Sequence, residues 1–241
     1  MNRIQVSEIQ VDAPLDRRYT LALVSDTHGR FPEELCRALG RWHLDGIAIA
    51  GDLVDTVEDF SRGAVWDFLH QCASMAPTFL ALGNHERDAG ARQLQSLARA
   101  GVTVLHNRSA SLGQLRLGGL TSGYCRPKRH GGSVPDVAWL AEFSREPGYK
   151  VLLCHHPEYY PRFIRQTPIQ LILSGHAHGG QIQVAGRGLY APGQGMLPRF
   201  TAGLYEDRLV VSPGLSNTAG LIPRLGNPRQ LVLVHLGKSE L

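Results

Sequence analysis

The chain has 241 residues, 43% of them hydrophobic and 19% charged, a composition that favours a globular protein and excludes a disordered one. The formal net charge of +4 suits anionic substrates but is too small to indicate nucleic-acid binding, so no nucleic-acid partner is expected. Four cysteines without Cys-x-x-Cys spacing exclude a disulfide framework and favour a reducing compartment. We therefore expect a cytoplasmic protein of unknown oligomeric state, with one domain over residues 1–241 because no Ser/Gly-rich linker interrupts the sequence.

Residues 1–11 alternate polar and apolar side chains, which predicts an edge strand. The segment has no continuous apolar region, and the sequence contains no apolar stretch long enough to cross a membrane. We expect neither a signal peptide nor a transmembrane segment.

Five short apolar runs follow along the chain, and each ends at an Asp, Asn or His. The runs are 21–25, 47–50, 77–82, 151–154 and 169–174. Their length and β-branched content predict buried strands, although periodicity alone does not exclude a helix. Helices are expected between the first runs, at 32–39, 63–74 and 89–100.

The second half of the chain is richer in short strands and turns. Strands are expected at 102–105, 110–112 and 114–120, forming a second and more antiparallel sheet, and later at 182–184, 208–212 and 230–235. The expected fold class is α/β, with two packed sheets and helices outside them.

The side chains that end the five runs form a mixed set of nitrogen and oxygen donors without a thiolate. They are Asp26, His28, Asp52, Asn84, His155, His176 and His178. The carboxyl ends of strands in α/β sheets line up along one edge, so these side chains are expected to converge. Such a donor set predicts a site for two divalent ions, Mn, Fe or Zn, whose identity stays open.

Asp52 is the expected hub of that site. Two dications about 3.5 Å apart repel by roughly 19 kcal/mol at an effective dielectric near 20, so they need a shared anion. Asp52 can bridge them with its two oxygens, and a water held between them would lose a proton and become a nucleophile. Each motif alone also has a structural reading: a turn for Gly51-Asp52, and a surface pair for His176 and His178. On an extended segment these two imidazoles would lie on the same side.

The order and spacing of these motifs resemble those of the calcineurin-like metallophosphoesterase superfamily. The motifs are Asp26-x-His28, Gly51-Asp52-x-x-Asp55, Gly83-Asn84-His85-Glu86, His155-x-Pro157 and Gly175-His176-x-His178. The string 175–181, with segments 190–192, 203–205, 211–215 and 226–228, is most similar to the bacterial YkuE/YaeI-like phosphodiesterase subgroup. The resemblance implies a four-layer αββα sandwich of two mixed sheets flanked by helices.

The resemblance also implies roles for individual residues. The first metal site would comprise Asp26, His28, Asp52 and His178, and the second Asp52, Asn84, His155 and His176. The expected catalytic residues are Asp52 and His85, the latter contacting the phosphate and protonating the leaving oxygen. His155 fits the ligand position two residues before Pro157, and His156 is the second choice.

The function predicted from these observations is hydrolysis of a phosphodiester or phosphomonoester by a metal-bridging hydroxide. The expected partner is a phosphorylated small molecule or lipid headgroup. The alternatives are a hydrolase of a nucleotide-sugar lipid pyrophosphate and a non-catalytic metal-binding interaction module on the same fold. The basic segment containing Arg126, Lys128 and Arg129 would bind a second anionic group of the substrate, unless it is simply a solvated turn.

Overall fold

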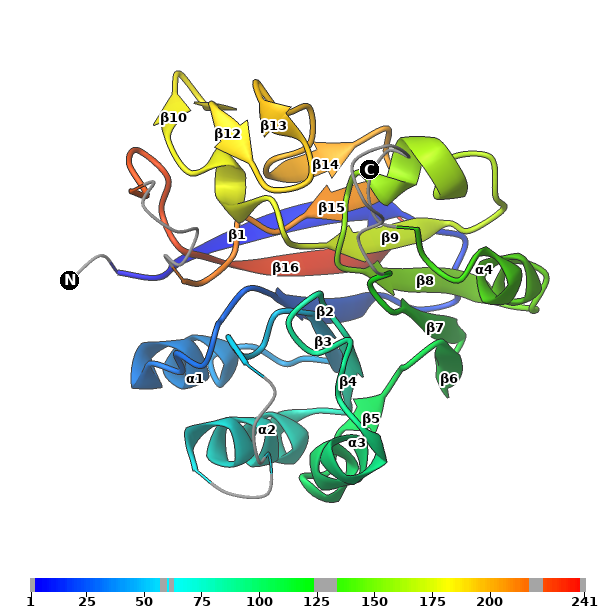
Figure 1. The fold of residues 1–241 in the computed structure, drawn as a ribbon. Helices are drawn as coiled ribbons and strands as arrows, with labels where there is room; N and C mark the ends of the chain where they lie inside the picture. Colours follow the sequence, from blue (N-terminus) through cyan, green and yellow to red (C-terminus); the bar gives the residue numbers. More distant parts are fainter. Residues whose placement is uncertain (1–2, 57–59, 61–62, 124–133, 217–222, 239–241) are drawn as a thin grey trace.

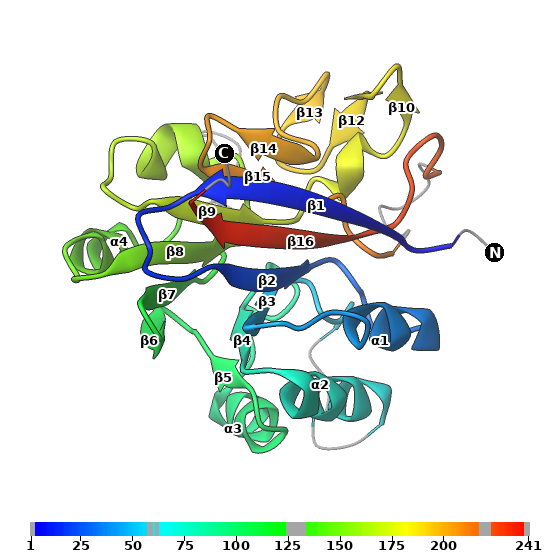
Figure 2. The same cartoon turned by 180° about the vertical axis from the view of Figure 1, so that it is seen from behind.

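The computed structural model describes residues 3–56, 60, 63–123, 134–216 and 223–238, and shows two six-stranded mixed sheets with helices on their outer faces (Figure 1, Figure 2). The first sheet has the order β1-β16-β2-β3-β4-β5. Its strands are β1 (Gln5–Asp12), β16 (Gln230–Gly237), β2 (Tyr19–Val24), β3 (Gly46–Ala50), β4 (Thr78–Ala81) and β5 (Thr103–Val104). The expected edge strand near the N-terminus is therefore confirmed as β1.

Strands β2 to β5 run parallel, so their carboxyl ends lie at one edge of the sheet. β16 runs antiparallel to β2 and parallel to β1, and therefore the beginning of β1 lies at this same edge. Three helices lie on one side of the molecule in Figures 1 and 2. They are α1 (Glu33–Leu39), α2 (Ala64–Met75) and α3 (Ala91–Arg99), close to the expected ranges.

The second sheet has the order β14-β15-β9-β8-β7-β6. Its strands are β14 (Gly203–Tyr205), β15 (Leu209–Val211), β9 (Leu171–Ser174), β8 (Tyr149–Cys154), β7 (Leu115–Leu120) and β6 (Arg108–Leu112). Its outer face is covered by α4 (Val137–Ser144) and a π-helical turn, Tyr160–Ile164, whose apolar side chains share a core cluster with the sheet. Neither of these two helical segments was predicted from the sequence.

Alternation along the strands explains why the first sheet is buried on both faces. In β2, Ala22 and Val24 join the core beneath the helices, whereas Leu21 and Leu23 join the core shared with the second sheet. Successive side chains of a strand point to opposite faces, so an uninterrupted apolar run supplies both cores. The four-layer arrangement follows from this burial on two sides.

One expected strand lies in the other sheet. The segment predicted at 102–105 forms β5, which pairs parallel with β4 at the edge of the first sheet, not with the second sheet. It follows α3, and a strand–helix–strand connection of this kind returns the chain parallel to the preceding strand. Strands β6 and β7 do form the expected antiparallel pair.

Two small hairpins lie beyond the second sheet. They comprise β10 (Gln183–Val184) with β11 (Arg187–Gly188), and β12 (Tyr190–Ala191) with β13 (Gly195–Met196). Within the described ranges, none of the helices combines the length and apolar character that a membrane span requires.

Candidate metal centre

The loops that follow the strands turn sharply through left-handed backbone conformations. The φ angles lie between 45° and 63° at five non-glycine residues: Asp26, His28, Asp52, His176 and His178. Such conformations cost roughly 1–3 kcal/mol each and persist where the surrounding structure fixes them. The sequence suggested an extended segment for His176 and His178, but the loop that contains them is bent. His178 begins a 3₁₀ turn, His178–Gly180.

Two glycines allow the loops after β3, β4 and β8 to approach closely. A Cβ atom at Gly51 would lie 2.7 Å from the Gly83 Cα and 2.9 Å from the His155 Cγ. A Cβ atom at Gly83 would lie 2.2 Å from the Asp52 Oδ1. Any side chain at either position would push these loops apart.

Backbone hydrogen bonds join the loops into one frame. The Asp26 N–H donates to the Gly51 carbonyl, and the His28 N–H to the Asp52 carbonyl, both at 3.1 Å. The His176 N–H donates to the Asp26 Oδ1 at 3.0 Å, which links the second sheet to the first. The centre is therefore built at the carboxyl edges of both sheets.

The expected ligands converge in this frame. The His155 Nε2 lies 3.0 Å and the His28 Nε2 3.9 Å from the Asp52 Oδ2. The His178 Nε2 lies 3.5 Å from the Asp26 Oδ1. Donor atoms within 4.8 Å of one another form four triplets among the described residues. Three of them contain Asp26 or Asp52, namely Asp26–His28–His178, Asp52–His155–His176 and His28–Asp52–His85, and the fourth, His156–Glu158–His176, shares His176 with them.

Hydrogen bonds at the far side of the rings orient the imidazoles. The Nδ1 of His155 bonds the Ala50 carbonyl at 2.7 Å, and the Nδ1 of His28 bonds the Asp55 Oδ1 at 2.8 Å. A histidine held through Nδ1 presents Nε2 as a ligand atom. Within the described part of the chain, the buried His28 Nε2 and Asn84 Oδ1 have no hydrogen-bond partner. Unpartnered buried donors and acceptors are costly, so these atoms fit metal ligands.

Burial and mutual attraction set the charges of the centre. Burial opposes ionisation of Asp52, but attraction to His155 lowers the pKa of Asp52 well below its usual range. Burial likewise opposes a charged His155, but Asp52 raises the pKa of His155 to about 10. Burial lowers the pKa of His176 and of His178, which favours the neutral imidazole that binds metals.

Glu86 ends the motif Gly83-Asn84-His85-Glu86, and the sequence alone predicted no role for it. It is fully buried, and its two oxygens accept hydrogen bonds from the backbone N–H groups of Asp52, Val54 and Gly83 at 2.9–3.0 Å. Burial, followed by the charge of Asp52, raises the pKa of Glu86 to about 7. Glu86 thus fixes the loop that carries Asp52, through backbone contacts that residue types alone could not reveal.

His85 lies at the mouth of the centre, with a third of its side chain exposed. Its Nδ1 bonds the Asp55 carbonyl at 2.6 Å, and its Nε2 lies 3.8 Å from the Asp52 Oδ2. Asp55 therefore orients both His28 and His85, a role that its place in the motif alone did not specify.

His156 is paired with Glu158 rather than with Asp52. Its Nδ1 bonds the Glu158 Oε1 at 2.9 Å, and Glu158 in turn lies 3.8 Å from the His176 Nε2. Burial lowers the pKa of His156 to about 3. The contact with Asp52 belongs to His155.

The expected substrate residues Arg126, Lys128 and Arg129 lie outside the residues that the structure describes.

The fold and the clustered Asp and His residues define a class of protein. The sequence model of the family described as calcineurin-like phosphoesterase matches residues 19–180, and the chain belongs to this family. The chain is 31% identical over 192 residues to phosphodiesterase YaeI of Escherichia coli, covering 73% of this chain and 65% of that protein. It is 27% identical over 187 residues to an uncharacterized metallophosphoesterase of Helicobacter pylori, covering 75% and 50%.

The chain thus spans about half to two thirds of the length of these curated relatives. Among solved structures, a 5'-nucleotidase precursor from Thermus thermophilus superposes with a TM-score of 0.50 at 18% identity, covering 67% of this chain and 42% of that one. At that identity the superposition demonstrates a shared fold.

Proposed function

We propose that this protein is a metal-dependent phosphoric ester hydrolase with a two-ion centre. The observation that carries the proposal is the set of overlapping Asp/His triplets, drawn from the edges of both sheets and joined through Asp52 and His28. Membership of the calcineurin-like phosphoesterase family agrees with it.

The two ions would be held by four residues each, with Asp52 common to both sets. The first set is Asp26, His28, Asp52 and His178; the second is Asp52, Asn84, His155 and His176. Nitrogen and oxygen donors without a thiolate suit Mn, Fe or Zn. When bound, such ions supply Lewis-acid activation of a phosphoryl group and lower the pKa of a water molecule.

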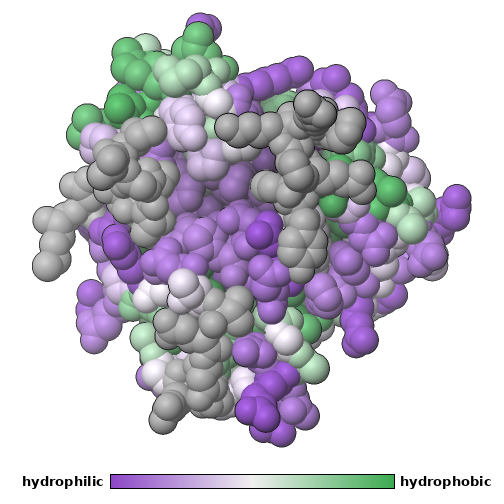
Figure 3. All heavy atoms as spheres, viewed as in Figure 1, coloured by the Kyte–Doolittle hydropathy of each residue, from purple (hydrophilic) through white to green (hydrophobic). Residues whose placement is uncertain are grey.

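The protein's own residues prepare the site for a phosphate. Asp26 and Asp52 supply two negative charges, and burial favours the neutral form of the His176 and His178 imidazoles, which add no positive charge to the ligand sets. The surface presents a hollow lined by hydrophilic side chains in the middle of the face in Figure 3, which suits a polar substrate.

His85 is the proposed general acid. Its Nδ1 is held by the Asp55 carbonyl, so as an imidazolium it directs the Nε2 proton toward the Asp52 carboxylate and the open side of the centre. A proton at that position can pass to the oxygen of a departing ester. Its partial exposure, in contrast to the buried ligands, is consistent with contact to substrate.

We propose a phosphodiester as the preferred substrate, because the chain is similar to a protein named a phosphodiesterase. The test is hydrolysis of matched aryl phosphomonoesters and diesters by the purified protein with added Mn, alongside its metal content. Manganese-dependent turnover favouring the diester supports the proposal; retained turnover of every ester in Asp52→Asn contradicts it. Preference for the monoester would overturn only the substrate assignment.

A further inference from the structure

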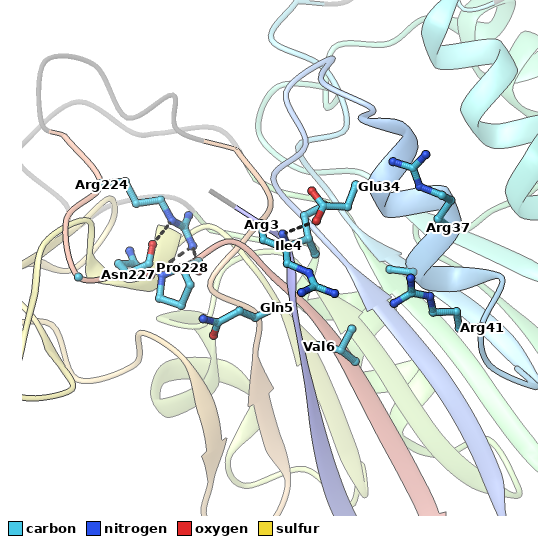
Figure 4. A pocket seen from close by; sticks show the side chains of 12 residues that line it. Arg3, Ile4, Gln5, Val6, Glu34, Arg37, Arg41, Arg224, Asn227 and Pro228 are labelled. Carbon is cyan, nitrogen blue, oxygen red and sulfur yellow. Dashed lines mark hydrogen bonds between the residues drawn. The ribbon is translucent and has the colours of Figure 1, made fainter. Parts of the chain in front are cut away.

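A cavity of about 790 Å³ lies at the same sheet edge as the candidate metal centre, between the beginning of β1, helix α1 and the segment 224–228 (Figure 4). Four arginines line it: Arg3, Arg37, Arg41 and Arg224. Glu34 is the one carboxylate among its described lining residues, and it accepts the Ile4 N–H at 3.2 Å. Four positive charges against one negative leave the lining with a charge of three positive.

The arginines differ in their existing contacts. Arg37 pairs with Glu33 at 3.0 Å, so its guanidinium group is less available to a ligand than a guanidinium group without a carboxylate partner. No hydrogen bond or ion pair joins the exposed Arg3 and Arg41 guanidinium groups to any described residue. Figure 4 shows both side chains extending into the space between β1 and α1. Two guanidinium groups that face a shared space without a partner among the described residues can both bind one anion there.

Arg224 forms the inner wall of the cavity. The guanidinium bonds the carbonyl oxygens of Gly214, Ser216, Asn227 and Pro228, and the Asn227 amide oxygen. All these partners are neutral, and within the described ranges no carboxylate bonds it. A largely buried cation with only neutral partners adds positive potential to the cavity.

The same wall adjoins the metal centre. The Asn227 Nδ2 donates to the His178 carbonyl at 2.7 Å, and Arg224 bonds the Gly214 carbonyl at 3.2 Å. A Cβ atom at Gly214 would lie 2.9 Å from the Asp26 Cβ. Asn227 therefore separates the cavity from His178, and Arg224 together with Gly214 separates it from Asp26; both His178 and Asp26 are proposed metal ligands.

We propose that this arginine pocket, lined by Arg3, Arg37, Arg41 and Arg224, binds a phosphate group that the substrate carries in addition to the one being hydrolysed. The inference rests on the proposed function, because it takes the reacting phosphate to occupy the metal centre. The planar donor forks of arginine match phosphate oxygens in pairs, so the pocket selects substrates with two phosphates over simple esters. The four arginines of the pocket are different residues from Arg126 and Arg129 of the basic segment that the sequence suggested for a second anionic group, which lies outside the described residues.

The first test counts phosphate sites on the metal-loaded full chain by equilibrium titration with inorganic phosphate. Two sites are expected in the parent and one in Arg3→Ser/Arg41→Ser, because loss of both charged contacts weakens the pocket by more than about tenfold. Arg145→Ser, at the exposed arginine that follows the last residue of α4, is the matched control and should keep both sites. Equal counts in the parent and the double variant would overturn the inference.

The same count separates this inference from the proposed function. If the metal centre did not bind phosphate while the pocket did, the parent would have one site and the double variant none. Circular dichroism of the double variant, whose substituted arginines are both exposed, checks that the fold is kept.

The second test identifies the source of the phosphate, using inhibition of bis(p-nitrophenyl) phosphate hydrolysis. Adenosine 3',5'-bisphosphate should inhibit the parent and Arg145→Ser at least about tenfold more strongly than adenosine 5'-monophosphate, and this advantage should fall below about threefold in the double variant. An unchanged advantage, together with a lost phosphate site, would assign the pocket to free phosphate and overturn its assignment to the substrate.

Discussion

Replacing Glu86 with Ala tests the internal support of the metal centre. The change leaves the N–H groups of Asp52, Val54 and Gly83 without their acceptor, and all three hydrogen bonds are buried. An unsatisfied buried donor costs about 1–3 kcal/mol, so the free energy of unfolding should fall by at least about 3 kcal/mol. For a chain of this size, that loss lowers the melting temperature by about 6–12 °C. Glu86→Gln keeps one acceptor oxygen and should recover part of the loss.

The assay is thermal unfolding of the metal-loaded protein, with metal content measured on the same samples. Metal affinity should fall about 10–100-fold, because groups that orient ligands tune metal binding. Glu142→Ala, an exposed glutamate on α4, is the matched control and should change neither quantity. If Glu86→Ala has the same melting temperature as the control and keeps two ions, the supporting role assigned to Glu86 is wrong.

Three further predictions concern the centre itself. Asp52→Asn should abolish hydrolysis and reduce the bound metal from two ions toward one or none, because the shared negative charge is lost; two bound ions with near-normal turnover would contradict this. His85→Ala should keep both ions while turnover falls by roughly 10²–10⁴, least for nitrophenolate, and an equal loss for all leaving groups would point to substrate binding instead. Burial opposes charge on His155, but Asp52 raises the pKa of His155 to about 10, so metal binding must displace a proton. Affinity should therefore rise with pH, by up to about tenfold per unit between about pH 7 and 9; calorimetry showing a flat profile would refute this.

The strands that carry the site could be predicted because their signal is local. A strand that is buried on both faces is a continuous apolar run in the sequence, so such a run predicts the strand directly. The polar residue after each run marks the carboxyl end of the strand. The convergence of Asp26, Asp52 and His155 follows from that placement alone. The sequence of β5 alone does not determine which sheet this strand joins, because its pairing with β4 depends on the connection through α3.

The parts that could not be predicted depend on backbone geometry and distant partners. The extended arrangement expected for His176 and His178 is wrong because left-handed residues bend that loop. The role of Glu86 depends on N–H groups that any residue type would supply. The arginine pocket unites Arg3 with Arg224, positions that the sequence separates by almost the whole chain and the sheet edge brings together.

The central claim is that two metal ions, sharing Asp52, carry out phosphoester hydrolysis. It is tested most directly by stepwise addition of Mn to the metal-depleted protein, with bound metal and aryl-phosphodiester hydrolysis measured at each step. The account predicts that hydrolysis stays low while the first equivalent binds and rises to its maximum as the second binds. Full activity in the metal-depleted protein, or at a single bound equivalent, would contradict it.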